Sequence, residues 1–177
     1  MIYLLDSNTF IQAKNFHYNP NFCSAYWDWI LKMNQSNRLF SISFVYDELI
    51  KGNDFLVNWS KTNSSLFIDC EDLTTQTELI IISDYVEKNK AAMAVNAFPE
   101  FMKGADPWLI AKAKSLNATV VTHETFNPQI IKKFLSYFVD ESRSSVCDTL
   151  AYLLLLNHKL PEAEKEIFRQ TRNALGR

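Results

Sequence analysis

Short apolar runs alternate with segments of helical periodicity along most of this chain. Runs of this length suit strands that are buried on both faces, and such strands are typical of parallel sheets. The expected strands are 2–5, 39–43, 66–70 and 118–122. The alternation predicts an α/β fold with a central parallel sheet of short strands flanked by helices.

Helical segments are expected between and after these strands. An aromatic and aliphatic stripe at helical spacing predicts a core-facing helix over 19–37, formed by Phe22, Tyr26, Trp29, Ile30 and Met33. Further helices are expected over 7–14, 44–52, 54–63, 71–89 and 91–99, from Asp106 onward, and over 145–157 and 161–173. Gly52 is expected to cap the helix that begins at residue 44, since glycine is common just beyond helix ends.

Length and composition favour one compact domain. The chain has 177 residues, of which 47% are hydrophobic, enough for a sizeable core. It has no repeat, low-complexity tract or flexible linker, so the expected domain covers 1–177, with a C-terminal helical extension over roughly 145–177. Only three glycines are present, which excludes a glycine-rich phosphate loop or dinucleotide-binding fingerprint.

The charge and the cysteines indicate a cytoplasmic protein without a membrane span. The net charge is −2 and the pI is about 5.9, so there is no basic footprint for nonspecific nucleic-acid binding. The N-terminal segment lacks the basic region of a signal peptide, and the longest apolar run, 150–156, is too short to cross a bilayer. Cys23, Cys70 and Cys147 are odd in number and widely spaced, which favours reduced thiols.

Four acidic residues are expected near the carboxyl ends of the strands. Asp6 directly follows the first strand, and Glu124 comes two residues after the last. Glu48 lies in the helix that follows the second strand, and Asp106 begins the helix that leads into the last one. Ligands of open parallel sheets bind at this edge, where the strand order reverses. The four carboxylates are therefore expected to converge there.

Each acid also has a purely structural interpretation. Asp106 precedes Pro107, which is typical of a helix N-cap followed by proline at the first helical position. Asp6 is placed to cap the next helix in the same way, while Glu48 and Glu124 are compatible with solvent-facing positions. Taken together, four such coincidences at one edge of the sheet are less convincing than a shared site.

Clustered carboxylates have a defined chemistry. Like charges a few ångströms apart raise one another's pKa unless a cation lies between them. A ligand set made only of oxygens selects a hard ion such as Mg²⁺ or Mn²⁺. Such an ion orients a phosphate, lowers the pKa of bound water and neutralises charge that develops during displacement.

The segments that carry these acids resemble the PIN-domain ribonucleases. They read DSN at 6–8, SFVYDELIKG with Glu48, ADPWLIAKA with Asp106, and VVTHE with Glu124. The similarity covers roughly residues 1–150 and extends to a PIN-like branch of bacterial toxin–antitoxin toxins. By this resemblance, Asp6, Glu48, Asp106 and Glu124 match the four family acids. Asn8 and Thr122 match the polar residues that hold them in place.

The resemblance implies a Mg²⁺- or Mn²⁺-dependent endoribonuclease with Asp6 and Asp106 as the main metal ligands. Glu48 and Glu124 would complete the carboxylate ring, and cleavage would leave a 5′-phosphate and a 3′-hydroxyl. The expected partners are an RNA substrate and a cognate antitoxin protein, and a homodimer is left open. The alternative from a different class is a catalytically weak binding module whose acidic cleft meets a basic peptide or partner protein.

Overall fold

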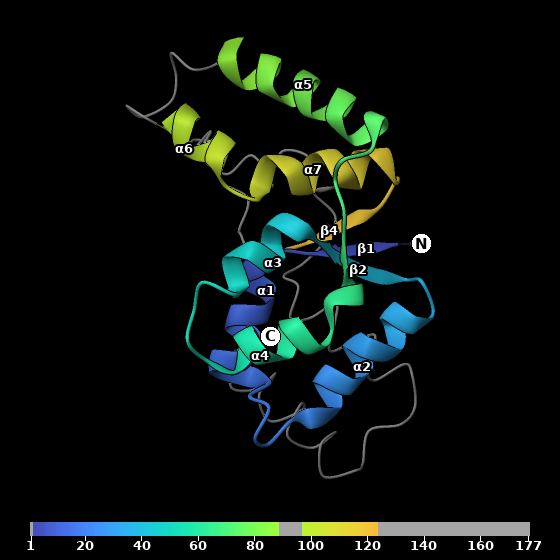
Figure 1. Cartoon of the computed structure of the whole chain (residues 1–177), viewed down its shortest axis with the longest axis vertical. Coiled ribbons are helices and arrows are strands. Elements are labelled where there is room, and N and C mark those ends of the chain that lie inside the picture. The colour runs from blue at the N-terminus through green and yellow to red at the C-terminus, as the bar shows by residue number, and fades with distance from the viewer. Residues whose placement is uncertain (1, 89–96, 124–177) are drawn as a thin grey trace, which may run out of the picture.

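The computed structural model describes residues 2–88 and 97–123, which form a parallel sheet covered by helices on both faces (Figure 1). The strands are β1 Tyr3–Leu5, β2 Leu39–Ile42, β3 Phe67–Ile68 and β4 Thr119–Val121. They form a four-stranded sheet in the order β3-β2-β1-β4, and every pairing is parallel. The predicted α/β class and the positions of the four strands are confirmed.

The strand order reverses beside β1. From β1 the chain builds β2 and then β3 on one side, and it returns to add β4 on the other side. Leu5 pairs with Val121 at the last position of the β1–β4 ladder. In sheets of this type, the crevice outside the carboxyl ends at such a reversal is where ligands bind. The residues that follow Leu5 and Val121 therefore lie at the expected position of a site.

Helices connect the strands and form a layer on each side of the sheet. In Figure 1, α5, α6 and α7 lie together on one side, whereas α1, α2 and α4 lie on the other. The helices are α1 Ser7–Gln12, α2 Ser24–Gln35, α3 Ser43–Leu49, α4 Phe55–Thr62, α5 Leu73–Lys88, α6 Ala97–Lys103 and α7 Asp106–Ser115. A π-helical turn, η1 Ala13–His17, extends α1, and a 3₁₀ turn, η2 Ser64–Leu66, precedes β3. In the described residues, no helix is long and apolar enough to span a bilayer.

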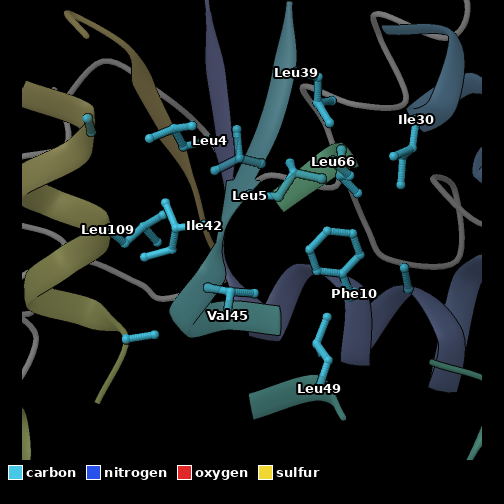
Figure 2. Close-up of a cluster of buried hydrophobic side chains, with 14 of the residues drawn as sticks. Leu4, Leu5, Phe10, Ile30, Leu39, Ile42, Val45, Leu49, Leu66 and Leu109 are labelled. Carbon is cyan, nitrogen blue, oxygen red and sulfur yellow. The ribbon is translucent and has the colours of Figure 1, made fainter. Parts of the chain in front are cut away.

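The hydrophobic core occupies both sides of the sheet. Leu109 of α7 lies beside Ile42 on one side, and Phe10 of α1 lies near Leu66 on the other (Figure 2). All four side chains are fully buried. Full burial of a side chain of this size stabilises the folded state by about 1.5–3 kcal/mol relative to leaving it exposed. Packing on both faces holds the strands in place, and it therefore also fixes where their carboxyl ends lie.

Left-handed asparagines end the two helices that lead into β2 and β4. Asn37 has a φ of 56° and Asn117 a φ of 48°, a region that asparagine enters more easily than most residues. After α7, the N–H of Ala118 donates to the carbonyl of Ala113 at 2.8 Å, which is the bond of a Schellman motif. Asparagine thus performs here the role that glycine usually fills.

Two expectations about helix ends are wrong. α2 begins at Ser24, so Phe22 lies before it and is 52% exposed, although the other members of the predicted stripe are buried. α3 ends at Leu49 and its C-cap is Ile50, in the right-handed region, so Gly52 does not cap it. In the first case the hydrophobic periodicity of the sequence extends to a residue before the helix begins. In the second, a residue type that is common at helix ends lies beyond the end of the helix.

Proline 99 does not end a helix. It is the third residue of α6, and the first turn of a helix tolerates proline because its N–H groups have no intrahelical acceptor. Residues 91–96 of the expected helix over 91–99 lie outside the described residues, as do the expected helices over 145–157 and 161–173, Cys147 and the proposed C-terminal extension. Cys23 and Cys70 are buried free thiols, as expected.

Candidate functional site

Asp6 is the buried acid of the carboxyl edge. It directly follows β1, is 1% exposed, and its N–H donates to the carbonyl of Val121 at 3.0 Å. It occupies the N-cap position of α1, yet its side chain makes no capping hydrogen bond to the helix interior. Instead the hydroxyls of Ser7 and Thr122 donate to its two carboxylate oxygens, at 3.3 and 2.9 Å. Its structural interpretation as a side-chain cap is therefore wrong.

Two further hydroxyls fix the strand ends around Asp6. Thr9 donates to the carbonyl of Val121 at 2.9 Å, and Ser41 donates to the carbonyl of Leu5 at 2.7 Å. Both side chains are buried, Thr9 at 1% and Ser41 at 0% exposure. Buried hydrogen bonds of this kind are costly to break, because the acceptor would be left unpaired. The edge that holds Asp6 is consequently a rigid one.

Glu48 joins α3 to the beginning of α7. Its Oε1 accepts the N–H of Ala105 at 3.1 Å, across 57 residues of sequence. Ala105 is the N-cap of α7 and has no side-chain acceptor of its own. The first N–H groups of a helix need external acceptors, and a carboxylate is favoured there by the helix dipole. Glu48 thus brings α3 against the residue that precedes Asp106.

Asp106 is the first residue of α7. The cap position belongs to Ala105, so the interpretation of Asp106 as the N-cap, with Pro107 following at the first helical position, is wrong by one residue. The Asp106 side chain is partly buried. Asp106 directly follows Ala105, whose N–H donates to the Glu48 carboxylate. The carboxylates of Glu48 and Asp106 therefore both belong to the N-terminal end of α7.

The electrostatic environment distinguishes Asp6 from an ordinary surface acid. Burial raises the pKa of Asp6 above its usual value of 3.8, and the negative charge of Glu48 raises it further. Hydrogen bonds from Thr122 and Ser7 act in the opposite direction. Neither Asp6 nor Glu48 forms an ion pair with any residue that the structure describes. No positive charge among residues 2–88 and 97–123 pairs with either carboxylate to offset their repulsion.

The remaining expected residues divide into two groups. Thr122 lies against Asp6, where the resemblance places it, whereas Asn8 is exposed and makes no side-chain hydrogen bond within the described part of the chain. Ser7 provides the second hydroxyl, and sequence reasoning missed it although it stands next to Asp6. The only signal available was that a residue one position into α1 remains close to its N-cap. Glu124 lies outside the described residues.

The donor set suits a hard cation by its chemistry. Among the described residues, the side chains that interact with the Asp6 carboxylate are the hydroxyls of Ser7 and Thr122 and the carboxylate of Glu48, and oxygen ligands of this kind favour Mg²⁺ or Mn²⁺. Across residues 2–88 and 97–123, no three His, Cys, Asp or Glu side chains lie close enough to form a complete metal cage. Mg²⁺ seldom uses such a cage, because it retains several waters and binds through one or two carboxylates together with substrate phosphates.

Comparison with curated proteins finds no match. Two solved structures are similar at 20% identity and a TM-score of 0.48 each. One is VapBC2 from Rickettsia felis bound to a DNA fragment from their promoter, with 74% of this chain and 96% of that chain covered. The other is VapBC-1 from nontypeable Haemophilus influenzae, with 77% and 92% covered.

A family model described as "Domain of unknown function (DUF4411)" matches residues 3–141. The match begins at the first residue of β1 and continues past β4, so it contains the whole sheet and every acid of the candidate site. The chain belongs to the DUF4411 family.

Proposed function

We propose that this protein is a Mg²⁺- or Mn²⁺-dependent endoribonuclease and the toxin of a toxin–antitoxin pair. The observation that carries the proposal is Asp6, a carboxylate at 1% exposure with no cationic partner among the described residues. It lies where the strand order reverses and is within the electrostatic influence of Glu48.

The free energy of this arrangement favours a bound cation. An ionised carboxylate that is buried without a positive partner is costly, and a second carboxylate nearby increases the cost. A divalent ion between them would offset both terms. The same edge offers the first turn of α7, where Asp106 stands beside the Ala105 N–H that Glu48 accepts.

The side chains have separate roles in this proposal. Asp6 and Asp106 would be the principal ligands, with Glu48 and Glu124 completing the ring directly or through water. When bound, the ion would lower the pKa of a water molecule and neutralise charge on the scissile phosphate. Thr122 and Ser7 hold the Asp6 carboxylate in one orientation, as hydroxyl donors commonly do for metal-binding acids. Hydrolysis would leave a 5′-phosphate and a 3′-hydroxyl.

The decisive experiment is digestion of a mixed RNA pool with Mg²⁺ or Mn²⁺ and with EDTA. Wild type should cleave only with metal, whereas Asp6→Asn and Asp106→Asn should be inactive with unchanged far-UV circular dichroism. Asp28→Asn is a matched control, because Asp28 is an exposed acid on α2. Full activity of Asp6→Asn would overturn the site assignment.

The partner proposals rest on the family resemblance of the sequence. We propose an inhibitory antitoxin protein that places a basic side chain among the acids. Pull-down from the native host should recover a small, separately encoded protein that suppresses cleavage. A homodimer is also proposed, and equilibrium sedimentation of the purified chain tests it. A cytoplasmic location follows from the same toxin proposal.

A binding module remains the second candidate function. One observation favours it, namely that the described residues alone do not gather three metal-binding side chains. In that case the acidic edge would bind a basic peptide, and neither Mg²⁺ nor Mn²⁺ would promote RNA cleavage. Absence of cleavage together with saturable binding of an oligolysine peptide, lost in Asp6→Asn, would favour the module.

A further inference from the structure

Two aromatic side chains stack where α3 meets α7. The ring centroids of Phe44 and Trp108 are 4.5 Å apart, and their planes differ by 11°. Both side chains are only partly buried. A parallel aromatic pair that reaches the surface presents a flat, polarisable face on which a third planar ring can stack.

This pair lies next to the candidate site. Phe44 precedes Glu48 by four residues, so both side chains lie on the same face of α3. On α7, Trp108 follows Ala105 by three residues, and the Ala105 N–H donates to Glu48. The ring stack and the Glu48–Ala105 hydrogen bond are therefore neighbouring contacts along one helix–helix seam, which runs beneath the beginning of α7 in Figure 1.

Two exposed lysines lie close in sequence to the residues of this seam. Lys51 comes just after α3, and its N–H donates to the carbonyl of Glu48 at 3.3 Å. Lys103 is the last residue of α6, two positions before Ala105. Within the described residues neither lysine forms an ion pair, in contrast to Lys14, Lys112 and Lys114.

The geometry points to a subsite for an unpaired nucleobase on the Phe44–Trp108 stack, with Lys51 and Lys103 contacting the adjacent phosphates. This inference rests on the proposed ribonuclease function and names its substrate as single-stranded RNA. A chain with a net charge of −2 gains little from charge alone in binding RNA. Base–aromatic stacking is largely independent of sequence, and it requires bases that are not held in a duplex.

The subsite is tested by binding in EDTA, where the RNA stays intact. Fluorescence anisotropy of a labelled oligouridine should show roughly tenfold weaker binding by Trp108→Leu than by wild type, from the usual contribution of one stacked base. Trp59→Leu is the matched control, because Trp59 of α4 is also a partly buried indole, but its ring partners are Phe10, Trp27 and Phe55 instead of Phe44. Its affinity should equal that of wild type.

Three further measurements make the result specific. Trp108→Phe keeps a stacking ring and should restore most of the affinity. Lys51→Gln and Lys103→Gln should each reduce the dependence of affinity on salt, as expected for lost phosphate contacts. A duplex of the same length should bind more weakly than the single strand. Circular dichroism and thermal melts show which variants remain folded.

The outcomes separate the two proposals. Wild-type affinity in a folded Trp108→Leu protein, equal binding of duplex RNA, or no binding by the wild type would each overturn the subsite. If binding depends on Trp108 but Mn²⁺ produces no cleavage, the ribonuclease proposal fails and the subsite stands. If wild type cleaves RNA and Trp108→Leu binds as well as wild type, the subsite alone fails.

Discussion

Asp6 at the sheet edge and Asp72 before α5 are both aspartates that accept a hydroxyl, yet their environments have opposite effects. Thr122 donates to Asp6 at 2.9 Å, and Thr75 donates to Asp72 at 2.7 Å. The Nζ of Lys112 lies 2.6 Å from Oδ2 of Asp72, and this contact lowers the pKa of Asp72 well below its usual value. Asp6 pairs with no lysine in the part of the chain that the structure describes, and burial raises its pKa.

Other acids follow the same division. Asp54 pairs with Lys14, and Glu78 pairs with Lys114 at 2.7 Å, so these contacts connect helices. Glu48, at the sheet edge, has no such partner in the described part of the chain and accepts a backbone N–H instead. Asp54, Asp72 and Glu78 each pair with a lysine from another part of the chain. Within the residues that the structure describes, Asp6 and Glu48 have no lysine partner, which leaves their charge available to a cation.

Metal should stabilise the carboxyl edge of the sheet around Asp6 and should not affect the contact between Asp72, before α5, and Lys112 of α7. Mn²⁺ at a hundredfold excess over its dissociation constant should raise the free energy of unfolding of wild type by about 2.7 kcal/mol. Asp6→Asn should respond much less, whereas Asp72→Asn should respond as wild type does. Thermal melts with EDTA and with Mn²⁺ measure all three. Equal shifts in all proteins would remove the distinction between the two regions.

The two threonines give the next largest contrast. Thr122→Val removes a donor from Asp6 and should lower the cleavage rate by roughly 10- to 100-fold, as for other residues that orient a metal ligand. Thr75→Val removes the equivalent donor from Asp72 and should leave cleavage unchanged. Thr122→Ser keeps a hydroxyl and should restore the rate. Loss of activity in both valine variants to the same degree would indicate a general packing effect.

Ionised Asp6 and ionised Asp72 should have opposite effects on the stability of the protein, and both effects should depend on pH. The folded-state pKa of Asp6 is raised, so its ionised form destabilises the protein at pH 7. In EDTA, Asp6→Asn should therefore have a free energy of unfolding about 1 kcal/mol higher than that of wild type. This advantage should shrink as pH falls through the folded-state pKa and vanish below 3.8.

The folded-state pKa of Asp72 is lowered, so its charge stabilises the protein above pH 3.8 and that contribution is lost in more acidic solution. Asp72→Asn should therefore melt lower than wild type at pH 7, with the difference closing as the pH falls. Melting curves of both variants from pH 3 to 8 test the signs. Parallel curves would show that neither aspartate has the environment described.

The smallest expected effect concerns Asn8. Its side chain is exposed and makes no hydrogen bond among the described residues, so Asn8→Ala should change the free energy of unfolding by less than about 0.5 kcal/mol. RNA cleavage should also remain at the wild-type level. A large loss of activity would mean that the amide of Asn8 helps to hold the acids in place, the role that the family resemblance implies for it.

Sequence reasoning reached the strands because burial on both faces leaves a clear apolar run, as at Leu4, Leu5 and Ile42. It also placed Asp6 at the carboxyl edge, since parallel strands end together, and the family resemblance added Thr122 beside it. It could not choose between Ser7 and Asn8, because that choice depends on the rotation of α1 about its axis. This rotation is set by tertiary packing, with Phe10 turned into the core.

Errors at helix ends have a similar origin. Phe22 continues the apolar period of α2 in sequence, but the helix begins only at Ser24. The role of Glu48 as an acceptor for Ala105 joins residues 57 positions apart, and no local pattern reports such a contact. Local signals therefore located the elements and the acids, and long-range contacts decided which side chains touch.

The central place of β1 has a consequence for how the protein is made. Its partner β4 is 116 residues further along, as the Thr122–Asp6 hydrogen bond records. Contacts at such separation form slowly, and during synthesis β1 has an unpaired edge until β4 leaves the ribosome. The carboxyl edge is incomplete for the same period. Under the proposed function, a nascent chain of this protein should therefore remain inactive until most of it has been translated.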